Sequence, residues 1–239
     1  LPSTVIIATN IHARPESLWR ACFLSTSARS EGATHVHLIC PWIAYGRQDR
    51  VVTPGEAPGG LLVAHWLREA FDTITTFDAH SAKFIDAFQG KLRNVHGSPL
   101  LFDGLREATI VVAPDEGARD RATEAGKLLQ LPIAVMKKTR SSGHVSVEIP
   151  SEAFDWNKQV PLLVDDMTDS GGTLITAAKV LKAAGAISVL AFVPHVLRGS
   201  VLQSRAEGVI NRIEMVFDHE ALTYAPGQLS LLTKQFLVV

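Results

Sequence analysis

The sequence predicts an α/β protein with two domains, each built on a mainly parallel sheet flanked by helices. Three observations support this class. Short apolar runs rich in β-branched residues recur along the chain, longer amphipathic segments separate them, and turn-forming or charged residues bound each run. Short apolar runs of this kind are typical of strands that are buried on both faces. Their alternation with helices favours mainly parallel sheets.

The expected elements follow in order along the chain. Strands are expected over residues 5–8, 36–39, 73–77, 110–113, 133–136, 162–164 and 189–193. Helices are expected over residues 16–31, 60–70, 116–129, 173–184 and 201–208. Gly185 stands where the C-cap of a helix is expected. Segments 41–60 and 137–150 are longer than ordinary strand-to-helix connections, and long loops in compact domains tend to carry function.

Composition limits the classes of partner. The chain has 239 residues, of which 46% are hydrophobic, so it can form one large or two modest domains. The 23 Lys and Arg residues nearly balance the 24 Asp and Glu residues. This balance gives no global attraction to nucleic acid or to an anionic membrane, and neither is an expected partner. Any phosphate site must therefore be a local cluster of residues.

The cysteines and the N-terminus bear on the compartment. Cys22 and Cys40 are the only cysteines, which predicts a reduced cytoplasmic protein without a disulfide framework. No Cys/His clusters have zinc spacing, and no apolar stretch of about 18 residues predicts a membrane span. The sequence starts at Leu1 with strand-like residues soon after, unlike a signal peptide. We interpret it as a chain whose start has been removed.

The strongest motif follows the strand expected at residues 162–164. That strand ends in Asp165 and Asp166, and the turn that comes next contains Asp169, Ser170, Gly171, Gly172 and Thr173. Backbone N–H groups at a helix N-terminus can hold a phosphate dianion, and the two carboxylates can accept hydrogen bonds from ribose hydroxyls. The alternative is an ordinary strand–turn–helix with capping Asp and Ser. It is less favoured, because adjacent Asp residues at a buried strand end are costly without a task.

A second motif carries two arginines at the end of the strand 36–39. In Tyr45-Gly46-Arg47-Gln48-Asp49-Arg50, the guanidinium groups could hold triphosphate oxygens in bidentate contacts. Taken alone, a solvated charged loop is the favoured interpretation.

These motifs together resemble a known family. The Asp165–Thr173 motif resembles the PRPP-binding signature that type I phosphoribosyltransferases share with 5-phosphoribosyl 1-diphosphate (PRPP) synthetases, so it does not choose between them. The arginine motif is similar to the Tyr-Ala-Arg-Gln-Asp-Arg segment with which PRPP synthetases bind ATP, and phosphoribosyltransferases lack that segment. The resemblance therefore implies ATP contacts for Arg47, Gln48, Asp49 and Arg50.

Two further segments match the synthetase pattern. Phe77-Asp78-Ala79-His80 resembles the family's Asp-Leu-His, and the resemblance implies that His80 contacts ATP and helps to hold Mg²⁺. Val112 to Ala118 is similar to the family's Ser-Pro-Asp-x-Gly-Gly, and Asp115 is implied as a Mg²⁺ or ribose contact. Both have plainer interpretations: a lone His is more often structural, and Asp115 also suits a helix N-cap.

The basic segment Met136 to Arg140 resembles the start of the synthetase catalytic loop. The resemblance implies catalytic roles for Lys138 and Arg140, whose cations would close over the phosphates and stabilise the charge that builds during transfer. The plain alternative is a solvated basic loop.

Together the motifs identify the chain as a member of the ribose-phosphate diphosphokinase (PRPP synthetase) family. The implied reaction transfers the β,γ-diphosphate of ATP to the C1 hydroxyl of ribose 5-phosphate, giving PRPP and AMP, with Mg²⁺ as cofactor. The expected domains are an ATP-binding one at residues 1–96 and a ribose-5-phosphate-binding one at 97–220, with the active site between them. Residues 221–239 are expected to return to the first domain, and a homo-oligomer is implied.

Two alternatives remain open. A phosphoribosyltransferase that consumes PRPP explains the turn at residues 169–173 but leaves the arginine motif and His80 unexplained. A non-catalytic regulatory homologue is suggested by a missing segment. In the family, an acidic Phe-x-Asp-Gly-Glu-type loop that contacts adenine precedes the first matched strand, and the sequence does not contain it.

Overall fold

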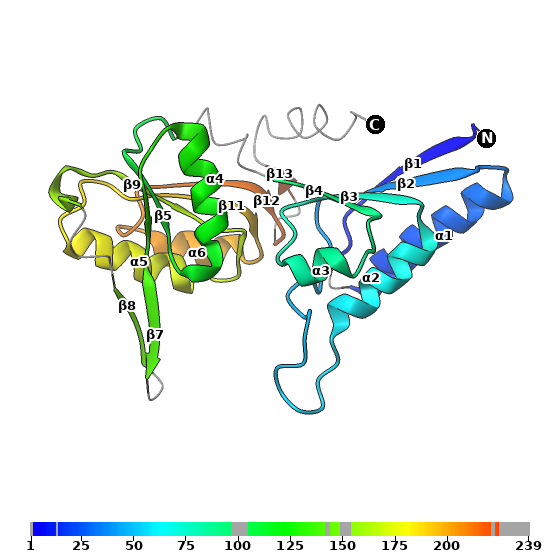
Figure 1. Cartoon of the computed structure of the whole chain (residues 1–239), viewed down its shortest axis with the longest axis horizontal. Coiled ribbons are helices and arrows are strands. Elements are labelled where there is room, and N and C mark those ends of the chain that lie inside the picture. Colours follow the sequence, from blue (N-terminus) through cyan, green and yellow to red (C-terminus); the bar gives the residue numbers. More distant parts are fainter. Residues whose placement is uncertain are drawn as a thin grey trace. The chain divides into compact units, whose positions relative to one another are not determined.

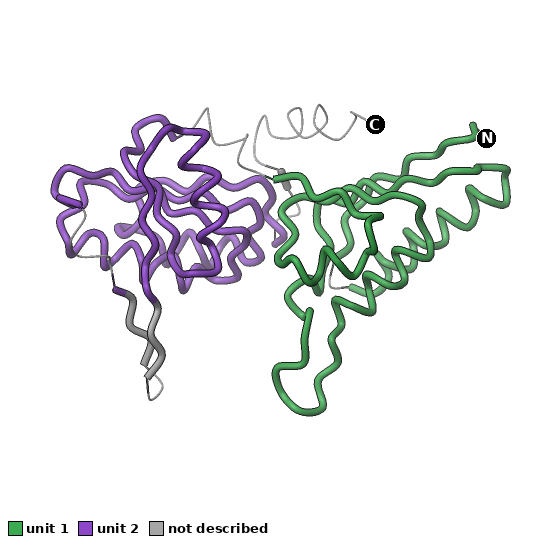
Figure 2. The backbone as a smooth tube through the Cα atoms, in the orientation of Figure 1, with its two compact units in different colours: residues 1–96, 234–239 green, residues 97–233 purple. Residues whose placement is uncertain are grey.

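The computed structural model describes residues 2–12, 14–96, 105–141, 144–148, 154–220 and 223–224, with side chains described outside 138–147 and 223–224. The chain divides into two compact units, one containing Leu1–His96 and the other Gly97–Thr233 (Figure 2). Each unit has its own sheet and its own core.

Unit 1 contains a four-stranded sheet in which every neighbouring pair is parallel (Figure 1). Its strands lie in the order β1 (Thr4–Ala8), β2 (His35–Ile39), β3 (Thr73–Phe77) and β4 (Leu92–Val95). Its helices are α1 (Pro15–Ser30), α2 (Gly59–Ala70) and α3 (Ala82–Asp86). In Figure 1 the three helices lie on the same side of the sheet.

The core of unit 1 forms where these helices meet the sheet. Along α2 the buried residues are Gly60, Val63, Ala64 and Leu67, a spacing that places one apolar stripe against the strands. Fully burying a side chain such as Leu67 contributes roughly 1.5–3 kcal/mol. The stripe explains why this helix is readily predicted from the sequence.

Unit 2 contains a larger sheet in the order β13-β12-β11-β9-β5-β6, with β10 paired to β11. All pairs are parallel except β12 with β13. The strands are β5 (Ile110–Ala113), β6 (Ile133–Val135), β9 (Pro161–Val164), β10 (Met167–Thr168), β11 (Leu190–Val196), β12 (Arg212–Asp218) and β13 (Thr223–Tyr224). The helices are η2 (Glu116–Ala118), α4 (Arg119–Leu129), η3 (Trp156–Lys158), α5 (Gly172–Ala183) and α6 (Gly199–Ala206).

The predicted α/β class with mainly parallel sheets is confirmed. Every residue of β5, β9 and β11 is buried, as their apolar runs predict for central parallel strands. Gly185, expected at a helix C-cap, follows the end of α5 with φ +102°, a conformation that favours glycine. None of the described helices combines the length and apolarity needed to cross a membrane.

Some expectations need correction. The segment after β6 was expected to be a long loop, but it forms an antiparallel pair of strands, β7 (Lys137–Ser141) and β8 (His144–Glu148), that extends from the sheet of unit 2 (Figure 1). The strand β1 is not buried on both faces, since Ile6 is 45% exposed at the end of the described sheet. The helix expected from residue 116 begins as the short 3₁₀ turn η2, and α4 starts at Arg119.

Candidate active site

In unit 1, the loops after β2 and β3 lie at the carboxyl edge of the parallel sheet. The amide of Cys40 donates to the carbonyl of Thr75 at 2.8 Å, and the amide of Phe77 donates to the carbonyl of Pro41 at 3.3 Å. Ligands of open α/β sheets bind at this edge, because the loops there vary without disturbing the core. The loops carry the arginine motif and His80.

The arginine motif forms a turn whose polar side chains differ in exposure. Arg47, Gln48 and Arg50 are exposed, whereas Asp49 is 8% exposed. The turn is held at the start of α2, where the amide of Gly60 donates to the carbonyl of Gln48 at 3.0 Å.

Gly60 permits this close approach. A Cβ atom at Gly60 would lie 2.5 Å from the carbonyl oxygen of Tyr45, so only glycine fits without a shift of the backbone. The sequence interpretation did not single out Gly60. The Pro58-Gly59-Gly60 run after the motif is the signal that could have identified it.

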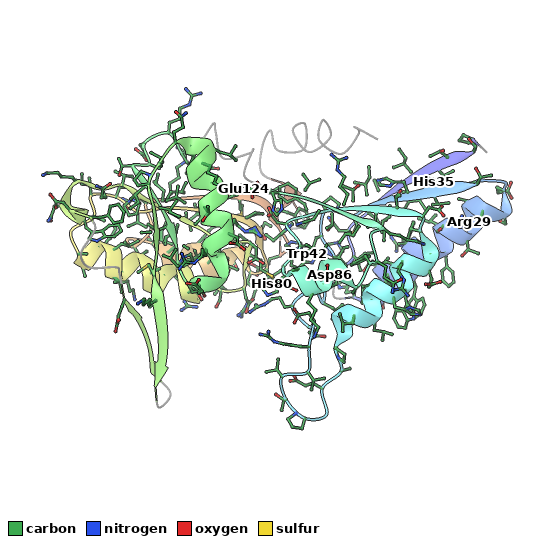
Figure 3. The ribbon with its side chains drawn as sticks, in the orientation of Figure 1. Arg29, His35, Trp42, His80, Asp86 and Glu124 are labelled. Carbon is green, nitrogen blue, oxygen red and sulfur yellow. The ribbon has the colours of Figure 1, made fainter. Side chains whose placement is uncertain are left out.

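Asp49 contacts the loop that carries His80. The hydroxyl of Ser81 donates to Oδ2 of Asp49 at 2.7 Å, and the same Ser81 oxygen caps α3 by accepting from the amide of Phe84 at 3.1 Å. His80 is exposed and lies beside the start of α3 (Figure 3). The bond between Asp49 and Ser81 therefore joins the arginine motif to the residue that follows His80.

In unit 2, Asp165 and Asp166 follow the carboxyl end of β9. Oδ1 of Asp165 accepts from the amide of Asp166 at 2.9 Å, and Oδ1 of Asp166 accepts from the amide of Met167 at 2.8 Å. Burial, the neighbouring carboxylate of Asp166 and the charge of Asp115 raise the pKa of Asp165 well above its usual value. This concentration of negative charge favours a ligand that donates hydrogen bonds or carries positive charge.

Asp115 approaches the same place from β5, the strand beside β9. Its Oδ1 accepts from the amide of Gly117 at 3.0 Å, so the capping role expected for Asp115 is confirmed, on the 3₁₀ turn η2. In the part of the chain that the structure describes, no three His, Cys, Asp or Glu side chains form a metal cage.

The segment that we name the Ser-Gly-Gly turn (residues 169–173) leads into α5. Gly171 has φ +76°, and its amide donates to Oγ1 of Thr168 at 3.1 Å. The N–H of Gly171 therefore bonds within the protein. A Cβ atom at Gly172 would meet no atom within 4 Å, so the space beside that residue is open.

Asp169 and Ser170 are held by α6 and the residue before it. Arg198 donates to both carboxylate oxygens of Asp169, each at 2.6 Å, and Arg205 donates to the carbonyl and hydroxyl oxygens of Ser170, each at 3.0 Å. The sequence interpretation missed both arginines. Their spacing, seven residues apart around a predicted helix, is the signal that could have identified them.

The residues expected to be catalytic are only partly described. Lys138 and Arg140 lie in β7, paired with Val147 and Val145 of β8, and their side chains lie outside the described residues. The expected return of residues 221–239 to unit 1 also falls mostly outside them, and the described part, β13, pairs with β12 in the sheet of unit 2.

Comparisons with known proteins bear on these motifs. A family model described as a phosphoribosyl transferase domain matches residues 79–211. The ribose-phosphate pyrophosphokinase of Methanopyrus kandleri is 34% identical over 205 residues, which cover 82% of this chain and 69% of that relative. The enzyme of the same name from Pyrococcus abyssi is 28% identical over 222 residues, which cover 92% of this chain and 75% of that relative.

A solved structure agrees with this likeness. The phosphoribosylpyrophosphate synthetase from Mycobacterium smegmatis matches with a TM-score of 0.74 and 25% identity, covering 89% of this chain and 71% of that one. The resemblance and the phosphoribosyltransferase-like α/β fold predicted from the sequence are confirmed.

Proposed function

Because the chain belongs to the ribose-phosphate pyrophosphokinase family, we propose that it transfers the β,γ-diphosphate of ATP to the C1 hydroxyl of ribose 5-phosphate, giving PRPP and AMP. One observation carries the proposal: the same chain presents an exposed arginine motif after β2 and two carboxylates followed by the Ser-Gly-Gly turn after β9. The first suits a nucleoside triphosphate, and the second suits a ribose phosphate.

On unit 1, Arg47, Gln48 and Arg50 contact the phosphates of ATP in this proposal. Their exposure at the carboxyl edge of the sheet supports the role, because the groups are open to an incoming ligand. Asp49 has a different part. Its low exposure and its bond to Ser81 favour a structural role, in which Asp49 holds the loop beside His80, and not direct contact with ATP.

On unit 2, Asp165 and Asp166 accept hydrogen bonds from the ribose hydroxyls, and the Ser-Gly-Gly turn binds the 5-phosphate. The open space beside Gly172 supports this, as does the position of Gly172 and Thr173 in the first turn of α5, where a helix attracts anions. Asp169 and Ser170 are also proposed contacts of ribose 5-phosphate within this turn. Each is bonded to an arginine, Asp169 to Arg198 just before α6 and Ser170 to Arg205 within it.

Mg²⁺ is the proposed cofactor, with His80 and Asp115 as protein ligands. The donor chemistry fits, since Mg²⁺ is usually bound by one or two carboxylates and keeps water and substrate phosphate oxygens as its other ligands. The repulsion of Asp165 by Asp166 and Asp115 also supports a cation beside these carboxylates. When bound, Mg²⁺ would neutralise charge on the phosphates.

Lys138 and Arg140 are the proposed catalytic cations. Lys138→Ala is expected to lower kcat about 10²–10³-fold, because a donor that stabilises the transferring phosphates is lost. The KM for ribose 5-phosphate should change little, and Lys137→Ala serves as the neighbouring control. Equal losses in turnover and in ribose 5-phosphate binding would contradict the role.

A homo-oligomer in a reducing cytoplasmic compartment completes the proposal. The oligomer rests on resemblance to the family. The compartment is supported by the two free cysteines, of which Cys40 is buried and has its pKa raised to about 12 by that burial, so its thiol stays protonated.

Product analysis tests the function. Purified protein is mixed with ATP, Mg²⁺ and ribose 5-phosphate, and AMP is separated from ADP by chromatography. AMP that appears only with ribose 5-phosphate, together with an equal amount of PRPP, is the expected result. ADP would indicate an ordinary kinase, nucleotide formation from PRPP and a base would indicate a phosphoribosyltransferase, and no turnover would favour a regulatory homologue.

A further inference from the structure

We propose that α6 is the support of the Ser-Gly-Gly turn, with Arg198 and Arg205 as positioning residues that set the affinity for the 5-phosphate. The inference rests on the proposed role of that turn in binding ribose 5-phosphate. It concerns residues outside all the motifs that the sequence analysis identified.

Three side chains, from α6 and from the residue before it, each meet a different residue of the turn. Leu202 and Arg205 are three residues apart on one face of α6, and Arg198 immediately precedes the helix. Arg198 contacts Asp169 and Arg205 contacts Ser170. The first three residues of the turn, 169–171, are therefore held by a single helix and the residue that precedes it.

Leu202 determines how closely the helix approaches. A Cβ atom at Gly171 would lie 2.4 Å from Cδ1 of Leu202, and the φ of Gly171 is +76°. Both facts require glycine at this position, because a side chain would collide with Leu202 and would strain the backbone. The glycine thus serves the contact with α6 as well as access for a ligand.

Arg198 binds the carboxylate of Asp169, which opens the turn. The guanidinium binds the carboxylate with two parallel hydrogen bonds of 2.6 Å, and the Arg198 amide also donates to the Asp169 carbonyl at 3.2 Å. The two side chains are 52% and 47% exposed, so the ion pair contributes little to folding stability. Its consequence is geometric, since it fixes where the turn begins.

Arg205 acts on the peptide group between Ser170 and Gly171. Its Nη1 donates to the carbonyl oxygen of that peptide at 3.0 Å, and the N–H of the same peptide donates to Oγ1 of Thr168 at 3.1 Å. With both ends bound, the peptide cannot rotate without breaking a hydrogen bond. The turn is therefore already in one conformation before a ligand arrives, which lowers the entropic cost of binding.

Arg205 also sets the direction of the Ser170 hydroxyl. Its Nη1 lies 3.0 Å from the Ser170 hydroxyl oxygen, and a guanidinium has donors but no acceptor. The Ser170 oxygen must accept in this bond, so its own proton remains to be donated elsewhere. A phosphate oxygen of the ligand is an acceptor of the required kind.

The test measures the dissociation constant for ribose 5-phosphate by titration calorimetry, with AMP formation assayed separately. We expect Arg205→Gln to weaken binding about tenfold, the typical effect of losing a charge-assisted hydrogen bond, with KM for ATP unchanged. Ser170→Ala should weaken binding similarly. The double variant should weaken binding by less than the product of the two single effects, because both substitutions remove the oriented hydroxyl, while Arg205→Gln also releases the Ser170 carbonyl.

Two variants serve as controls. Arg212→Gln removes another exposed arginine, which pairs with Glu214 at 2.7 Å on β12, and should leave binding unchanged. Arg205→Lys retains the charge and should recover part of the affinity. Unfolding midpoints of all variants should stay near that of the unaltered chain, so that lost binding reflects the turn and not the fold.

The outcomes separate this inference from the proposed reaction. The role of α6 would be overturned if Arg205→Gln left the affinity for ribose 5-phosphate unchanged, or if it changed KM for ATP equally. Fully additive effects of Arg205→Gln and Ser170→Ala would also overturn it. So would failure of the unaltered chain to bind ribose 5-phosphate. Binding by the unaltered chain without AMP formation would overturn diphosphate transfer and leave the affinity comparison to decide the role of α6.

Discussion

At the residue scale, ionisation of Asp165 carries an energetic cost in the folded chain. Burial and the negative charges of Asp166 and Asp115 raise its pKa, so the folded chain holds a proton at pH values where the unfolded chain has released it. The unfolding free energy therefore falls as the pH rises from the ordinary Asp pKa of about 3.9 to the raised value. At pH values above the raised pKa, the loss of unfolding free energy stays at its full size.

We therefore expect Asp165→Asn to raise the unfolding midpoint at pH 7 by a few degrees in metal-free buffer. The Asn oxygen can still accept from the Asp166 amide, while the unfavourable charge is gone. Thermal unfolding followed by circular dichroism between pH 4 and pH 8 measures the effect, with Asp120→Asn on α4 as the control. A lower midpoint at pH 7 would show that the ionised group stabilises the fold.

The same substitution should act oppositely on activity. A hydrogen bond from a ribose hydroxyl to a charged carboxylate is worth about 1.5–3 kcal/mol, or roughly 10–150-fold in kcat/KM for ribose 5-phosphate. More stability with less activity is the combination expected when a costly group is retained for a ligand.

At the element scale, α3 begins at a residue that also joins two loops. Ser81 caps α3 through the amide of Phe84 and donates to Asp49 in the arginine motif. A five-residue helix has little stability of its own, so the cap and its tertiary contacts hold it in place.

We expect Ser81→Ala to lower the unfolding free energy by about 0.5–2 kcal/mol and to raise KM for ATP, because the cap and the link to the arginine motif are both lost. Ser81→Thr should retain both. Urea unfolding and steady-state kinetics measure the two effects, and Ser27→Ala on the exposed side of α1 is the control. A stability loss with KM for ATP unchanged would assign Ser81 to the cap alone.

At the scale of the whole molecule, the two proposed substrates are assigned to different units. The arginine motif belongs to the unit that contains Leu1–His96, and the Ser-Gly-Gly turn belongs to the other. Substitutions in each unit should therefore affect the KM values of different substrates.

Arg50→Gln should raise KM for ATP about tenfold or more with little change for ribose 5-phosphate, and Asp166→Asn should do the reverse, because each removes a charged contact to one substrate. Initial rates with one substrate varied and the other saturating measure the split. Arg20→Gln on α1 is the control for unit 1. If either variant changed both KM values equally, the division of roles between the units would be wrong.

Much of the fold could be predicted because local patterns and tertiary packing agree. The apolar runs of β5, β9 and β11 are buried as expected, and the stripe of α2 packs as its spacing predicts. The strand β4 was missed because Leu-Arg-Asn-Val has no apolar run. Its pairing with β3 supplies the stabilisation that its own residues do not.

The sequence by itself determined the α/β class, the family and the residue types at each motif, because strand periodicity and motif order are local properties of the chain. Only the tertiary structure decided which of those residues bond to distant parts of the protein. Asp49 bonds to Ser81, Asp169 bonds to Arg198, and the Ser170 hydroxyl is oriented by Arg205. In the order given, the two residues of each pair are 32, 29 and 35 positions apart in the sequence, and folding brings them within hydrogen-bonding distance. No local pattern encodes such a contact.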